Sequence, residues 1–132
     1  MFDVEELRDV GVPDVAEEAC IRWRAAGEET EVVTWESLVK QFGLADCGAS
    51  NICEAIIVRR TNSVECIIQD RPDWRGVCVG VNALTDRGWD VTVLAPLAAL
   101  GTAHEGLRGT AARIQGWWTR EAAMRFSPVE MA

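Results

Sequence analysis

The sequence has only one histidine, His104, and none of its glycines belongs to a phosphate-binding motif. A single histidine excludes metal sites that need two, and it leaves one imidazole that could act as a base. No Gly-Lys-Ser or Gly-Lys-Thr occurs, and the glycines near Gly76, Gly80 and 101–109 fit neither the P-loop nor the dinucleotide fingerprint. We therefore expect no cofactor and no metal.

Long apolar runs and paired cysteines are also missing. The longest nearly apolar stretch, 91–100, contains Thr92 and Pro96 and has about half of the roughly 20 residues that a membrane helix needs. The N-terminus carries acidic residues where an export signal needs basic ones. The five cysteines are odd in number and form no C-x-x-C pair, so a reducing cytoplasm is expected; they are Cys20, Cys47, Cys53, Cys66 and Cys78.

The composition that remains is that of one folded domain with an acidic N-terminal half. Of the 132 residues, 48% are hydrophobic and 26% are charged, which is enough to build a single core over 1–132. Residues 1–50 hold twelve acidic and four basic side chains, whereas 51–132 hold nine of each, so the whole net charge of −8 lies in the first part. An acidic half repels phosphate backbones and anionic lipid, and any charged partner should be basic.

Residues 1–50 predict three helices, each of which begins at a capping residue and ends at a glycine. The first two have the capping-box spacing and run from Asp3 to Gly11 and from Asp14 to Gly27. The third begins at Thr34 and ends at Gly43, after a possible short strand at 31–33.

Residues 54–95 predict strands, because β-branched runs alternate with turn residues. The four candidates are 55–60, 64–69, 77–84 and 90–95. Their connections are too short for crossover helices, so they should pair as an antiparallel meander. A helix over 52–59, capped by Asn51 and Glu54, is the alternative for the first; the run Ile56-Ile57-Val58 favours the strand.

The last part of the chain predicts a helix over 97–122. Apolar or aromatic residues and His104 recur there at steps of three and four, and glycines could break the helix near Gly109. The expected fold is α+β: a meander of about four antiparallel strands, covered on one face by the N-terminal helices and this C-terminal helix.

A non-enzymatic protein–protein interaction or regulatory module is the function that these features favour. The segment Arg71, Asp73, Trp74 and Arg75 resembles an exposed loop, and arginine with tryptophan is typical of interface hot spots. Stacking of Arg75 on Trp74, or a pair between Arg71 and Asp73, would explain the same residues structurally. The expected partner is another protein, which should be basic if it is charged, or a second copy that pairs through the C-terminal helix or a sheet edge.

A small hydrolase is one alternative. His104 would act as the base for a cysteine or be oriented by a carboxylate, and the candidates are Cys47, Cys53, Cys66, Cys78, Asp70, Asp73 and Asp86. The structural interpretation of the same residues is that His104 lies on a packed helix seam and that the cysteines, Cys66 and Cys78 above all, are small buried hydrophobes.

A DNA-binding regulator is the other alternative. Residues 35–54 resemble the helix-turn-helix of transcriptional regulators, with Gly43 at the turn and apolar residues at Leu38, Phe42, Leu44, Ala49 and Ile52. With the strand before it and the hairpin after it, the order is similar to that of a winged helix. The resemblance implies that Asn51 reads a base, and Arg59 and Arg60 would contact the DNA.

Overall fold

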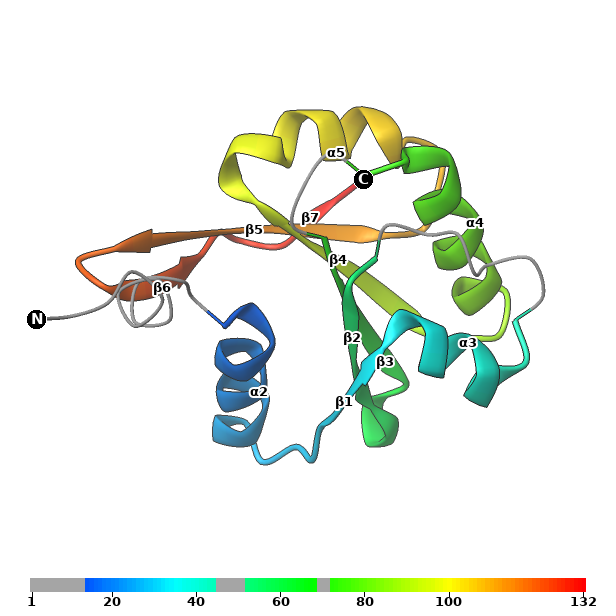
Figure 1. Ribbon diagram of the computed structural model, residues 1–132, viewed down its shortest axis with the longest axis horizontal. Helices are drawn as coiled ribbons and strands as arrows, with labels where there is room; N and C mark the ends of the chain where they lie inside the picture. Colours follow the sequence, from blue (N-terminus) through cyan, green and yellow to red (C-terminus); the bar gives the residue numbers. More distant parts are fainter. Residues whose placement is uncertain (1–13, 45–51, 69–71) are drawn as a thin grey trace, which may run out of the picture.

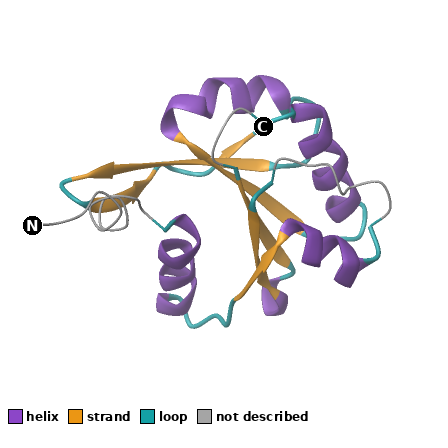
Figure 2. Cartoon of the chain, in the orientation of Figure 1, coloured by secondary structure: helices purple, strands orange, loops and turns teal. Residues whose placement is uncertain are grey.

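The computed structural model describes residues 14–44, 52–68 and 72–132, and in that part of the chain seven strands form one mixed sheet (Figures 1 and 2). Four α-helices pack against it. The α+β class is confirmed, whereas a purely antiparallel meander is wrong. The helix predicted from Asp3 to Gly11 lies outside the described residues.

The second and third predicted helices are confirmed. Helix α2 (Val15–Ala25) begins at Asp14, whose side chain caps the first turn. Helix α3 (Trp35–Phe42) begins at Thr34, which caps in the same way, and ends at Gly43 in the left-handed conformation, with φ of 62°. A side-chain oxygen at the N-cap satisfies a backbone N–H that the helix leaves unpaired, so these boundaries could be predicted locally.

The first three strands of the sheet are antiparallel. Strand β1 (Glu31–Thr34) pairs with β2 (Glu54–Val58), which pairs with β3 (Ser63–Ile67). Of these two pairings only that between β2 and β3 was expected. A 3-10 turn, η1 (Arg59–Thr61), closes the β2–β3 hairpin. Residues 54–58 are therefore a strand, as predicted, and not part of a helix over 52–59.

The strand predicted at 77–84 is wrong, because this segment belongs to helix α4 (Trp74–Thr85). Its buried residues include Val77, Val81 and Leu84, which share one helix face. The helix crosses from the end of β3 to the start of β4 (Asp90–Pro96), so β4 pairs with β3 in parallel.

The prediction of one long C-terminal helix over 97–122 is also wrong. A 3-10 turn, η2 (Leu97–Ala99), leads into the short helix α5 (Leu100–Gly106). The chain then turns through Gly109, with φ of 86°, as the glycines had suggested. Strand β5 (Arg113–Arg120) follows and pairs in parallel with β4.

Two short strands complete the sheet on the far side of β5. Both β6 (Ala123–Phe126) and β7 (Glu130–Met131) pair with β5 antiparallel, near its end and its start respectively. In Figure 1, β5 and β6 form a hairpin that extends beyond the other strands, on the side of α2.

Helices cover both faces of the sheet, not one as expected. Alternate residues of β2 belong to two different cores: Ala55 and Ile57 pack with α3, α4 and α5, whereas Ile56 and Val58 pack with α2. Helix α2 is 11 residues long, or about 16 Å, and one helix of that length cannot cover a sheet of this width. Among the described residues, part of the sheet face on which α2 packs is therefore left open.

Candidate functional site

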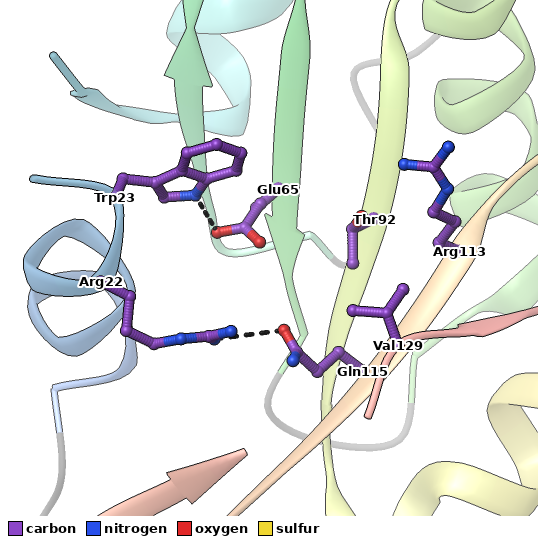
Figure 3. A pocket seen from close by; sticks show the side chains of 7 residues that line it. All are labelled: Arg22, Trp23, Glu65, Thr92, Arg113, Gln115 and Val129. Carbon is purple, nitrogen blue, oxygen red and sulfur yellow. Dashed lines mark hydrogen bonds between the residues drawn. The ribbon is translucent and has the colours of Figure 1, made fainter. Parts of the chain in front are cut away.

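The open part of the α2 face holds a cavity of about 550 Å³ (Figure 3). Its lining combines side chains from α2, three parallel strands and the segment before β7; they are Arg22, Trp23, Glu65, Thr92, Arg113, Gln115 and Val129. Small-molecule sites usually measure about 300–1,000 Å³, so the cavity has the size of a ligand site.

The register of the sheet brings the polar residues of the cavity together. Glu65 on β3 is the partner of Thr92 on β4, which is the partner of Arg113 on β5. Gln115 lies two residues beyond Arg113 and therefore faces the same side. Figure 3 shows Arg22 and Trp23 reaching from α2 toward these strands.

Glu65 is a buried carboxyl group in the middle of the sheet, with only 7% of the residue exposed. Trp23 Nε1 donates a hydrogen bond to Glu65 Oε1 at 2.7 Å. Burial raises the pKa of Glu65, and the hydrogen bond from Trp23 and the charge of Arg22 oppose that rise. The other oxygen, Oε2, makes no hydrogen bond with a described residue.

Gln115 is buried as deeply, at 4% exposed, and it positions Arg22. Its Oε1 accepts a hydrogen bond from an Arg22 nitrogen at 3.2 Å, and its Nε2 donates to the carbonyl oxygen of Ser127 at 2.8 Å. The Arg22 guanidinium also lies 4.1 Å from the ring centroid of Phe126. Two contacts from the β5–β6 hairpin thus hold Arg22 at the edge of the cavity.

Arg113 lies at the rim, on the far side of Thr92 from Glu65 in Figure 3. Its side chain is exposed and has neither a hydrogen bond nor an ion pair within the described part of the chain. With Arg22 and Arg113 against Glu65, the cavity has a formal charge of +1 in a protein of −8. An anionic group is therefore favoured here although the surface as a whole repels it.

Three residues of the predicted interaction loop, Asp73, Trp74 and Arg75, lie at the start of α4. Asp73 is the N-cap, and its side chain accepts from Arg75 N at 3.2 Å. Trp74 is half-buried against Gly106 of α5, and Arg75 is exposed. Arg71 lies outside the described residues. The structure thus gives Asp73 and Trp74 roles in folding, and their proposed contact with a partner stays a prediction.

The residues that the helix-turn-helix resemblance implied are partly engaged elsewhere. Arg59 pairs with Glu31 at 3.2 Å, and Arg60 pairs with Glu28. The first helix of the resemblance is α3, the segment 45–51 with Asn51 lies outside the described residues, and the end of the resemblance runs into strand β2.

His104 is half-buried on α5, and its Nε2 lies 2.8 Å from an oxygen of Glu130 in β7. No hydrogen bond joins it to a described cysteine or aspartate. Cys66 is fully buried, as expected, and burial raises its thiol pKa to about 12; burial also raises the pKa of Cys78. A raised pKa disfavours the thiolate that nucleophilic catalysis needs.

Neither a metal cluster nor a membrane helix is found among the described residues. No group of three or more His, Cys, Asp or Glu side chains there could hold a metal ion. No helix there has the length and apolar character to span a bilayer. The described cysteines are all free.

The cavity was not predicted, although the sequence contains one signal of it. Glu65 is a charged residue inside the apolar run 64–68, and a charge at that place is rare in a strand that is buried on both faces. Most of the residues that share the cavity with Glu65 could not be inferred, because they come from α2 and from a strand predicted to be helix.

In comparisons with protein families, with curated proteins and with solved structures, the chain has no match.

Proposed function

We propose that this protein is a non-enzymatic, regulatory binding module that holds a small polar molecule in the cavity on the α2 face. The observation that supports this most directly is the burial of Glu65 and Gln115 in the middle of the sheet, facing an open cavity. Apolar residues at these two positions would pack the sheet at no electrostatic cost, so the polar pair is best explained by a ligand.

The composition of the cavity favours binding over catalysis. Its titratable lining, as far as the described residues show it, consists of one carboxyl group and two guanidinium groups, with neither a thiol nor an imidazole. General acid–base chemistry and covalent catalysis usually need a second group that accepts or returns the proton. His104 has a different partner, Glu130, and is not in the cavity lining.

The experiment is to identify what the protein retains when it is purified from its own host. Denaturation and mass spectrometry of the released small molecules should yield one compound in near-stoichiometric amount. Thr92→Phe should remove it, because the larger side chain grows into the cavity from the strand between Glu65 and Arg113.

Thr119→Phe is the matched control, since Thr119 is exposed on β5 and does not line the cavity. It should retain the compound. Equal retention by the Thr92→Phe variant would contradict the proposal. So would a wild-type protein that takes up nothing after dialysis against a low-molecular-weight extract of the host.

Contact with a protein partner is a second candidate function, and a sheet edge favours it. Strand β1 pairs with β2 alone in the described part of the chain, so no described strand occupies its other edge, and Val32 on it is 44% exposed. Edge strands of this kind can pair with a second copy or another chain. If two copies pair here, sedimentation equilibrium should show a dimer that Val32→Lys dissociates; a wild-type monomer would exclude the dimer.

A further inference from the structure

We infer that the ligand of the cavity is a small zwitterion, whose ammonium group binds Glu65 and whose carboxylate binds Arg113. This inference rests on the proposed function, because it names the class of molecule that the same cavity takes. It follows from the way in which the cavity separates its opposite charges.

Glu65 and Arg113 lie in one register row but do not pair with each other. Two strand spacings separate them, so their Cα atoms are about 10 Å apart, with Thr92 between them. The ion pairs of the described residues join other side chains. Neither charge is therefore taken up by an ion pair with a described residue, and each can bind a ligand group of the opposite sign, with the guanidinium of Arg22 as a further charge beside Glu65.

The anionic end of the cavity is fixed in place but not saturated. Trp23 holds Oε1 of Glu65, and Oε2 has no described partner. Arg22 is held by Gln115 and Phe126, and no hydrogen bond joins it to Glu65. A buried carboxylate with a free oxygen is best satisfied by a charged donor, and an ammonium group supplies one.

The cationic end suits a carboxylate. The guanidinium of Arg113 is a planar fork that can bind both oxygens of a carboxylate, and it has no partner in the described structure. Thr92 places a hydroxyl between the two ends, where it can donate to or accept from either ligand group.

The distribution of charge argues against ligands of one sign. A ligand with only anionic groups would face the carboxylate of Glu65, and one with only cationic groups would face Arg22 and Arg113. A zwitterion meets an opposite charge at both ends. The cavity volume of about 550 Å³ leaves room for a short ligand side chain, which Trp23 and Val129 could contact with their apolar surfaces.

The test is a binding survey with defined compounds. The probes are the standard L-amino acids and two ω-amino acids, β-alanine and γ-aminobutyrate, each at millimolar concentration. Propionate and ethylamine serve as half-molecules that carry only one of the two charges. At least one zwitterion should raise the melting temperature and bind in calorimetry, whereas the half-molecules should bind at least about tenfold more weakly.

Variants test which end of the cavity binds which group of the ligand. Glu65→Gln keeps the shape and can still accept from Trp23, and Arg113→Gln removes the other charge; each should weaken the zwitterion at least about tenfold. Arg120→Gln, an exposed residue of the same strand outside the cavity, should leave affinity unchanged. Circular dichroism and urea unfolding confirm that each variant is folded.

Three results would overturn the inference. One is that no zwitterion of the survey binds, and another is that binding survives both Glu65→Gln and Arg113→Gln. The third is that a half-molecule binds as tightly as the zwitterion. In every case the host compound removed by Thr92→Phe would still establish a ligand site, so the inference can fail while the proposed function stands.

Discussion

Gly106, the last residue of α5, leaves the space that the ring of Trp74 on α4 occupies. A Cβ atom at position 106 would lie 2.4 Å from Cγ of Trp74 and 2.8 Å from its Cβ. These atoms are close to the backbone and cannot swing away without moving the helix. The contact between the two helices therefore depends on a residue without a side chain.

We expect Gly106→Ala to destabilise the protein by about 1–3 kcal/mol, the usual cost of overpacking. Gly101→Ala, in the same helix, is the matched control because nothing lies within 4 Å of its added Cβ. It should be neutral or stabilise by up to about 1 kcal/mol, as Ala is the better helix former. Urea unfolding measures both, and equal free energies of unfolding for the two variants would contradict the packing argument.

The buried carboxyl group of Glu65 leads to a prediction about how stability depends on pH. Its pKa in the folded protein lies above its ordinary value of 4.5, mainly because burial disfavours the charged form. The folded state thus binds the proton more tightly than the unfolded state. Its contribution to stability is complete below pH 4.5 and is lost as the pH rises through the folded pKa.

The Glu65→Gln variant has no carboxyl group at this position, so it does not lose this contribution to stability as the pH rises. The free energy of unfolding of the variant should therefore increase relative to that of the wild type as the pH rises from 4.5 to neutrality. Urea unfolding of both proteins across this range measures the difference. A difference that does not change with pH, or that changes in the opposite direction, would show that burial does not govern this carboxyl group.

Helix α4 shows at the scale of elements why local signals succeed at helix ends and fail in between. Asp73 is a recognisable cap, but Val77, Cys78, Val79 and Val81 are typical of strands. Val77, Val81 and Leu84 share one helical face. Gly80 belongs to it as well, because the ring of Trp35 fills the space beside it. That contact joins α3 and α4 and cannot be read from either segment.

The cap of α4 yields a prediction that separates folding from partner binding. Asp73→Ala should reduce the free energy of unfolding by about 1 kcal/mol, because Arg75 N loses its acceptor. Asp86→Ala, at the C-cap of the same helix, removes a negative charge from the negative end of the helix dipole and should be neutral or stabilise by a few tenths of a kcal/mol. If Asp73→Ala leaves stability unchanged, Asp73 is not acting as a cap, and its predicted role at an interface gains support.

Strand β5 shows the same difficulty in reverse. The apolar residues of the predicted helix 97–122 continued at helical spacing through Ile114 and Trp118. In the structure 113–120 is a strand, in which Gln115, Gly116 and Trp117 pair with β4. A Cβ atom at Gly116 would lie 3.2 Å from Cδ1 of Leu97 and 3.4 Å from Cδ1 of Leu100, so these two side chains pack closely over the strand at this position. The spacing of apolar residues therefore agreed with a helix by coincidence.

Net charge makes a prediction for the whole molecule. The protein carries −8, and Arg59 and Arg60, which were assigned to DNA contact, pair with Glu31 and Glu28. We expect no shift of duplex DNA in gel electrophoresis even at low salt, where electrostatic binding is strongest. A salt-sensitive shift that Arg59→Gln abolishes would instead support the regulator alternative.

The amino-acid sequence alone determined what depends on neighbours along the chain. The caps at Asp14 and Thr34, the left-handed glycine at Gly43 and the apolar run of β2 all act within a few residues, so they could be predicted. Tertiary structure alone decided the parallel order β3-β4-β5 and the placing of α2 on the opposite face from the other helices. It therefore also decided the cavity, because Glu65 and Arg113 become neighbours only through strand register, and Trp23 reaches Glu65 across 42 residues of sequence.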